Sequence, residues 1–109
     1  MISASLGRSG VRLAVAAALS LYLGVAHAEE SKVTIDNFTF APAELKVKVG
    51  DTVTWSNQDD IPHTVVSAGK FRSKAMDTDG TFSFTFTAAG EYKYFCSLHP
   101  HMTGTIKVE

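Results

Sequence analysis

Apolar and polar residues alternate along most of the chain after Ser31, and this period of two predicts half-buried β-strands. Gly, Pro, Asn and Asp residues separate the alternating stretches, as turns require, and no stretch has a helical period. Many short strands at this spacing predict an all-β fold, a small sandwich or barrel of two packed antiparallel sheets. The apolar strand positions are Val33, Ile35, Leu45, Val47, Val49, Val53, Trp55, Phe82, Phe84, Phe86, Tyr92, Tyr94, Ile106 and Val108.

The aromatic residues of this pattern are expected to form the core. Phenylalanine occupies every second position of 82–86, and this face, like Trp55, is predicted to pack between the sheets. The segment 71–79 mixes charged and apolar residues without a period, so we expect a long surface connection there. Asp59 and Asp60 are expected to form a solvated turn.

Residues 1–28 have the pattern of a secretory signal peptide. Arg8 and Arg12 precede an apolar run of about 14 residues, which is shorter than the ~20 residues that a membrane-spanning helix needs. The small residues Ala26 and Ala28 fit a cleavage site after Ala28. We therefore predict that residues 29–109 form one mature domain without a membrane span, which lies in the periplasm or is secreted. Loss of the two arginines lowers the formal net charge from −1 to −3.

Composition and charge narrow the classes of function. The 10 basic and 11 acidic residues are scattered, and without a basic stripe we expect no nucleic-acid partner. Cys96 is the single cysteine, so the chain cannot form an intramolecular disulfide. A lone cysteine in an oxidising compartment indicates an intermolecular bridge, a reactive thiol or a metal ligand.

The candidate chemistry is concentrated around Cys96. His99 and Met102 follow it in the run Cys-Ser-Leu-His-Pro-His-Met, and the mature chain has two further histidines, His63 and His101. Two imidazoles, one thiolate and a weak thioether are the donors of an electron-transfer copper site. The alternatives are a buried structural cysteine, a packing role for the methionine and a solvated role for His63. We predict that His101 points outward and is not a ligand.

The mature chain resembles the cupredoxins, and most of all their amicyanin and plastocyanin branch. The spacing Cys-x-x-His-x-x-Met is similar to that of amicyanins. The resemblance implies a cupredoxin-like Greek-key sandwich with antiparallel or mixed sheets in residues 29–109. It also implies one copper ion, Cu⁺ or Cu²⁺, with the ligands His63, Cys96, His99 and Met102. The other matching pieces are Phe38-Thr39-Phe40 with Pro42 and Leu45, Val49 to Trp55, Pro62-His63-Thr64-Val65, Phe82 to Phe86, and Gly90 with Tyr92 and Tyr94.

Two positions depart from the family pattern. Thr64 stands where the family often has Asn, whose amide ties the two ligand loops together, and a hydroxyl makes fewer hydrogen bonds than an amide. Leu98 stands where amicyanins frequently have Pro, and we expect its backbone N–H to donate to the Cys96 sulfur. Because such a bond favours the reduced state, we predict a higher reduction potential than in Leu98→Pro.

The resemblance implies a periplasmic one-electron carrier that shuttles electrons between redox partners. His99 is the expected exit for the electron, because its outer edge should reach solvent. We expect a monomer, and transient partners that dock on a small surface near His99, Pro100 and His101.

Other functions make different demands on the same residues. The main alternative is a periplasmic copper carrier or buffer that binds the ion for delivery, for which Met76 and His101 are the only extra ligands. An enzyme is not expected, because a catalytic metal needs an open position and four ligands fill this site. A copper-free binding or adhesion domain would not require Cys96.

Overall fold

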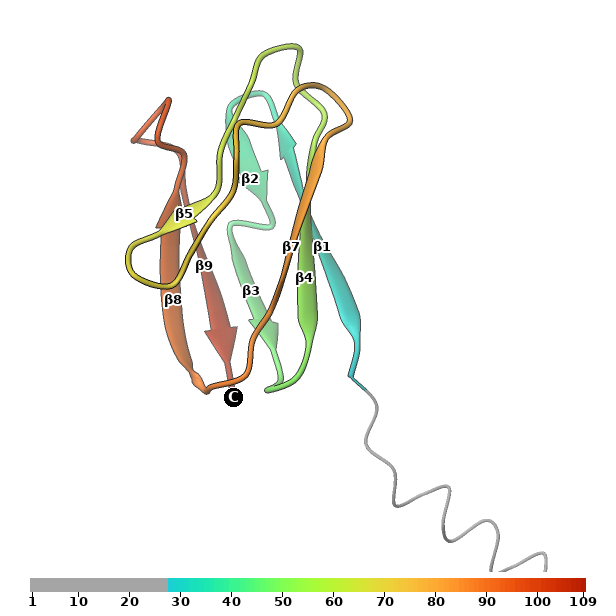
Figure 1. Ribbon diagram of the computed structural model, residues 1–109, viewed down its shortest axis with the longest axis vertical. Helices are drawn as coiled ribbons and strands as arrows, with labels where there is room; N and C mark the ends of the chain where they lie inside the picture. The colour runs from blue at the N-terminus through green and yellow to red at the C-terminus, as the bar shows by residue number, and fades with distance from the viewer. Residues whose placement is uncertain (1–27) are drawn as a thin grey trace, which may run out of the picture.

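The alternating stretches form short strands, which pack as two sheets around one apolar core (Figure 1). The structure is a computed structural model that describes residues 28–109. All of the predicted signal peptide except its last residue lies outside this range. Within it, no helix has the length and apolar character needed to span a membrane. The strands are β1 (Glu30–Asp36), β2 (Thr39–Ala41), β3 (Glu44–Val47), β4 (Thr52–Asn57), β5 (Val66–Ser67), β6 (Phe71–Arg72), β7 (Thr81–Thr85), β8 (Gly90–Phe95) and β9 (Thr103–Val108).

The first sheet has the strand order β2-β1-β4-β7. β1 is antiparallel to β2 and parallel to β4, and β7 is antiparallel to β4. Alternate residues of β1 and β4 face inward, and Val33, Ile35, Val53 and Trp55 are completely buried. The period of two in the sequence therefore corresponds to the inner face of this sheet.

The second sheet has the strand order β3-β9-β8-β5-β6. β8 is antiparallel to β9 and to β5, whereas β3 is parallel to β9. The all-β sandwich is therefore confirmed with mixed sheets: the pairs β1–β4 and β3–β9 are parallel, whereas the strand spacing alone predicted antiparallel sheets. Alternation indicates which face of a strand is buried and carries no information about strand direction, so the sequence pattern could not show this.

Two local predictions also need correction. The segment 71–79 is not a surface connection throughout, because it contains β6 and buries Phe71 and Met76. The ring of Phe71 packs against Trp55 with 5.6 Å between centroids. The buried residues of this segment are irregularly spaced, so its sequence has no regular hydrophobic pattern. Val49 lies beyond the end of β3, in the turn before β4, and is 48% exposed.

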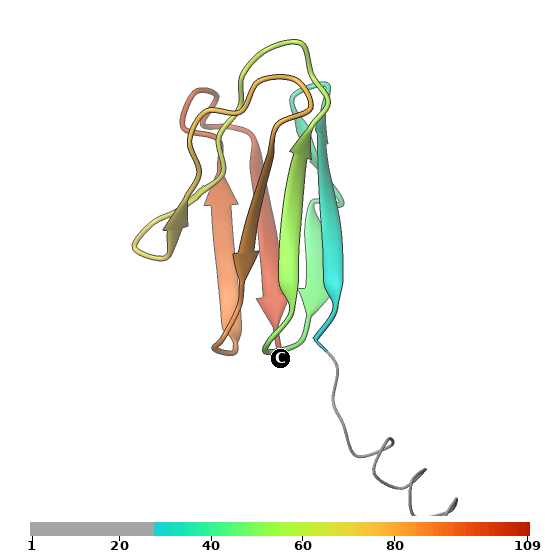
Figure 2. The ribbon, with the colours of Figure 1, turned by 45° about the vertical axis from the view of Figure 1, so that its right-hand side comes forward.

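The predicted aromatic core is confirmed. Trp55 and Phe86 are completely buried, and Phe82 and Phe84 pack against the same cluster. Figures 1 and 2 show that the loops after β1, β4 and β8 gather at one end of the sandwich, opposite the C-terminus. The predicted ligands lie in the loops after β4 and β8, so the sandwich brings distant parts of the chain together at this end.

Candidate metal centre

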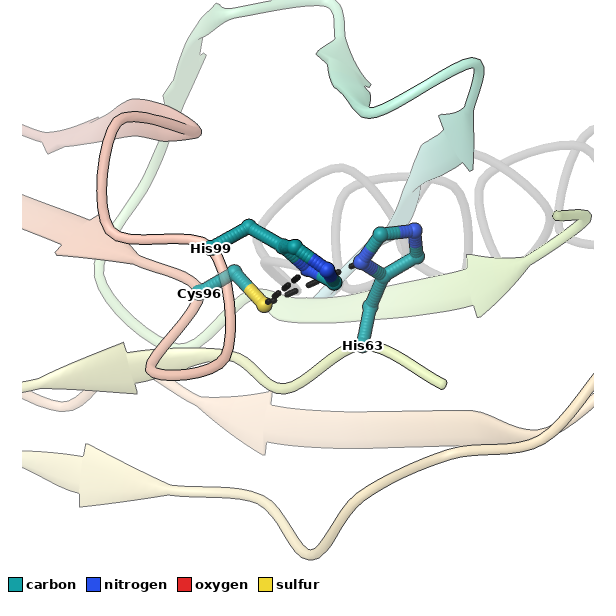
Figure 3. A group of neighbouring side chains, drawn as sticks. All are labelled: His63, Cys96 and His99. Atoms are coloured by element: carbon teal, nitrogen blue, oxygen red, sulfur yellow. Dashed lines mark hydrogen bonds between the residues drawn. The ribbon is translucent and has the colours of Figure 1, made fainter. Parts of the chain in front are cut away.

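Three side chains of metal-ligand type converge at this end of the sandwich. His63 follows β4, Cys96 follows β8 and His99 lies in the same loop as Cys96. Their ligand atoms all lie within 4.8 Å of one another. Cys96 Sγ is 3.7 Å from His63 Nδ1 and 3.6 Å from His99 Nδ1 (Figure 3). Metal–sulfur and metal–nitrogen bonds of about 2.3 and 2.0 Å at a tetrahedral angle would separate such donors by about 3.5 Å. The three side chains therefore fit around one small ion.

The backbone of His63 is fixed by a pair of hydrogen bonds with Met76. The N–H of His63 donates to the carbonyl of Met76 at 3.2 Å, and the N–H of Met76 donates back at 2.9 Å. The side-chain amide of Asn57 donates to the Met76 carbonyl as well, at 2.9 Å. His63 is completely buried and Met76 is 6% exposed. Met76 therefore packs in the core and supports the backbone beside His63.

The loop after β8 is closed by hydrogen bonds within itself. The N–H of His99 donates to the Cys96 carbonyl at 3.2 Å, and the N–H of Met102 donates to the His99 carbonyl at 2.9 Å. The N–H of Cys96 donates to the Met102 carbonyl at 3.2 Å. Met102 is 3% exposed and belongs to the same core cluster as Cys96. The loop thus holds the three sequence-predicted residues in one tight turn, with the thioether on the buried side.

Thr64 connects the two loops directly. Its backbone N–H donates to Cys96 Sγ at 3.3 Å, and its hydroxyl lies 3.7 Å from the same sulfur. The hydroxyl also accepts from the Ser97 N–H at 2.7 Å and lies 2.8 Å from the Ser97 hydroxyl. A threonine therefore ties the loops together where the family often has Asn. In the described part of the chain, no hydrogen bond joins the Leu98 N–H to the sulfur, so that expected donor is absent.

The surroundings of Cys96 stabilise its thiolate. Burial raises the pKa of the thiol, but the hydrogen bond from the Thr64 N–H and the contacts of the sulfur with the rings of His63 and His99 and with the Thr64 hydroxyl outweigh it and lower the pKa to about 6. Only the thiolate is a strong metal ligand, so this environment prepares the sulfur for a soft cation.

Asp59 belongs to the metal centre, although the sequence pattern did not indicate it. Its carboxylate Oδ2 lies 2.8 Å from His63 Nε2, on the side of the ring away from Cys96, and its side chain is only 12% exposed. The backbone N–H of Phe38 donates to this carboxylate, and despite partial desolvation this bond and further ones from Asn37 and His63 lower the pKa of Asp59 to about 2. Asp59 is thus not a solvated turn residue. A spacing of four residues before a histidine has no fixed meaning in a loop, so the sequence carried no signal for this contact.

The outer side of the centre is lined by exposed residues. Phe38 is 45% exposed and packs edge-on against both imidazoles, with centroid distances of 5.4 Å to His63 and 5.0 Å to His99. His99 itself is half-buried, so one edge reaches solvent. Leu98 is 52% exposed, and His101 is exposed as predicted. The sequence named Phe38 only as part of a matching piece and did not place it at the site.

Comparison with known proteins agrees with this donor set. Residues 27–109 match the family described as copper binding proteins, plastocyanin/azurin family. Amicyanin of Paracoccus denitrificans is 40% identical over 83 residues, which cover 71% of this chain and 63% of that protein. The chain thus spans less than two thirds of that relative's length. Amicyanin-alpha of Methylorubrum extorquens is 32% identical over 98% of this chain and 95% of its own length.

Solved structures give the same result for the fold. A mutant of amicyanin in the Cu(I) state has a TM-score of 0.70 and 37% identity, over 80% of this chain and 88% of that chain. The fold and the site define a cupredoxin. The chain belongs to the plastocyanin/azurin family of copper-binding proteins, and its cofactor is one copper ion.

Proposed function

We propose that this protein is a periplasmic one-electron carrier whose copper ion is bound by His63, Cys96, His99 and Met102. The observation that carries the proposal is the convergence of a buried thiolate-forming sulfur and two imidazole Nδ1 atoms, with 3.6 and 3.7 Å between sulfur and nitrogens. The burial of Met102 in the same closed loop supports its assignment as the residue that would supply the fourth ligand, a thioether. The bound copper supplies a one-electron couple between Cu⁺ and Cu²⁺.

The residues around the site support electron transfer by limiting movement. Cu⁺ and Cu²⁺ prefer different geometries, so a site that holds its donors in one arrangement reduces the rearrangement that accompanies the electron. Three sets of hydrogen bonds hold the donors: those of Thr64, those between His63 and Met76, and those within the loop 96–102.

The exposed edge of His99 is the proposed electron exit. Pro100 and His101 are exposed beside it, and Phe38 and Leu98 add apolar surface. A small, largely apolar surface fits brief encounters with redox proteins better than a lasting complex. We therefore propose transient docking here by a monomer.

The alternative function, copper delivery, has less support from the described residues. A copper carrier would expose additional soft ligands for transfer of the ion, but Met76 is buried. Of the two candidate extra ligands, only His101 is exposed. Enzymatic turnover is not proposed, because four protein ligands leave no open position for a substrate.

Addition of copper(II) to the purified copper-free protein tests the site. We expect an intense blue charge-transfer band in the wild type and in His101→Ala, and no such band in Cys96→Ala. A wild type that binds copper without the band, or a Cys96→Ala variant that keeps it, would contradict thiolate ligation.

Voltammetry and copper transfer separate the two functions. An electron carrier gives a fast, reversible couple with rapid self-exchange and releases copper slowly to a chelator. A copper carrier shows the opposite behaviour, with rapid transfer of the ion. Rapid transfer of the ion without a fast, reversible couple would show that the protein is a copper carrier, and the copper site itself would still stand.

Export is a separate part of the proposal. We expect the protein recovered from the periplasmic fraction to begin at Glu29, because Ala28 ends the pattern of a cleavable signal. The mass of the recovered protein measures this, and an uncleaved chain that stays in the cytoplasm would contradict it.

A further inference from the structure

The carboxylate of Asp59 faces the nitrogen of His63 that points away from the proposed copper position. Asp59 Oδ2 and His63 Nε2 are 2.8 Å apart, while His63 Nδ1 faces the Cys96 sulfur. His63 is completely buried and the Asp59 side chain is 12% exposed. A contact this short between two largely desolvated groups orients the ring strongly.

We propose that Asp59 is a positioning residue of the metal centre, holding His63 with its proton on Nε2 so that Nδ1 is free to bind the ion. The inference rests on the proposed function for its effect on copper. A carboxylate that accepts from the outer nitrogen of a ligand histidine fixes both the tautomer and the orientation of the ring, and raises its basicity as a ligand.

The carboxylate is itself held in place by the turn between β1 and β2. The N–H groups of Asn37 and Phe38 donate to its two oxygens, at 2.6 and 2.9 Å. Both turn residues have positive φ angles, +52° and +57°, which residues other than glycine rarely adopt. Asp59 is anchored on its other side by Thr78, whose hydroxyl donates to the Asp59 carbonyl at 2.6 Å. The negative charge is therefore fixed beside His63 before any ion binds.

This arrangement also affects the copper couple. A negative charge next to a ligand favours the more positive ion, so it strengthens binding of Cu²⁺ more than binding of Cu⁺. The carboxylate therefore lowers the reduction potential. The same turn places Phe38 against both imidazoles, so Asp59 connects the buried ligand to the exposed surface of the site.

The neighbouring Asp60 provides a matched control. It is exposed and makes no hydrogen bond or ion pair within residues 28–109. Asp59→Asn and Asp60→Asn remove the same charge one residue apart, but only the first removes it from the ring of His63. In Asp59→Asn the amide also turns a donor toward at least one of the backbone N–H groups that now donate to the carboxylate.

The test compares copper affinities and potentials of the two variants. We expect Asp59→Asn to bind Cu²⁺ about tenfold more weakly than Asp60→Asn does, as replacement of such partners typically does. With an unchanged Cu⁺ affinity, tenfold corresponds to a rise in potential of about 59 mV for one electron. Equal affinities and potentials in the two variants would overturn the proposal.

A second measurement uses the copper-free wild type, so it requires no copper and no substitution. Nitrogen NMR of the copper-free wild type, at a pH where the ring is neutral, reports which nitrogen of His63 carries the proton. We expect the proton on Nε2, and a proton on Nδ1 would overturn the proposal. If the wild type gave no reversible copper couple, the proposed function would fail, and this measurement would still decide the role of Asp59.

Discussion

Thr64 is the residue through which the two ligand loops contact each other most directly. Its backbone N–H and hydroxyl approach the Cys96 sulfur, and its hydroxyl bonds to Ser97. The sequence suggested that a threonine would tie the loops less well than the family's Asn. The structure shows that the backbone and hydroxyl share this role, which depends on the approach of the second loop and has no local sequence signal.

The Thr64→Val substitution tests this link. It keeps the shape and the backbone N–H and removes the hydroxyl, so we expect the unfolding free energy of the copper-free protein to fall by about 1 kcal/mol. We also expect a lower reduction potential, because the sulfur loses a donor that favours the reduced state. Urea unfolding and voltammetry measure the two effects.

Thr85→Val is the control for this experiment. It removes a hydroxyl from an exposed pair with Thr52, the first residue of β4, at the end of that strand opposite the loop that carries His63. We expect its potential to equal that of the wild type. If the potential of Thr64→Val also equalled that of the wild type, the hydroxyl would have no influence on the sulfur.

Among the structural elements, the turn between β3 and β4 depends on Asp51. The carboxylate of Asp51 accepts from the N–H of Lys48 at 2.8 Å and from the N–H of Glu29 at 3.0 Å. The hydrogen bond from Lys48, followed by that from Glu29, lowers the pKa of Asp51 below its ordinary value of 3.8. This residue therefore links the turn to the residues before β1.

The pH dependence of stability should report this turn. Because the folded-state pKa is lowered, the stabilisation is fully present above pH 3.8 and is lost as the pH falls through the folded-state value. We expect Asp51→Asn to be less stable than the wild type at neutral pH, and the difference to shrink in acid. Denaturant unfolding of the copper-free protein over this pH range measures it.

The exposed Asp36 supplies the comparison for that series. Asp36→Asn removes an equal charge from β1, and we expect its difference from the wild type to stay small at all pH values. A difference for Asp51→Asn that stayed constant into acid would show that its carboxylate is not stabilised in the folded state.

The pairing of β8 and β9 is adapted to the side chain of Tyr94. Gly104 lies opposite Tyr94, and a Cβ added at this glycine would overlap the tyrosine ring and hydroxyl. We expect Gly104→Ala to destabilise the protein by about 1–3 kcal/mol, because Tyr94 is buried and has little space to move. Thermal unfolding measures the loss, with Thr103→Ala at an exposed position of β9 as control. Equal stabilities of the two variants would contradict the close packing.

In the whole molecule, the sequence predicts the features that depend on local patterns. The strands followed from alternation, and Cys96, His99 and Met102 stood out because their spacing is short and their donor types match one kind of ion. His63 could be added only through the family resemblance, since it lies 33 residues from Cys96.

The features that the sequence did not show all depend on contacts between distant segments. The parallel pairs β1–β4 and β3–β9 follow from how the chain passes between the sheets. The burial of Met76 depends on its pairing with His63. The contact of Asp59 depends on the turn at Asn37. Such contacts are set by the packed fold and leave no period in the chain.

A crystal structure of the copper-loaded protein tests the central claim most directly. We predict one copper ion bonded to Cys96 Sγ and to Nδ1 of His63 and His99, with the sulfur of Met102 at a longer distance. Copper bound elsewhere, or bound without the Cys96 sulfur, would contradict the account.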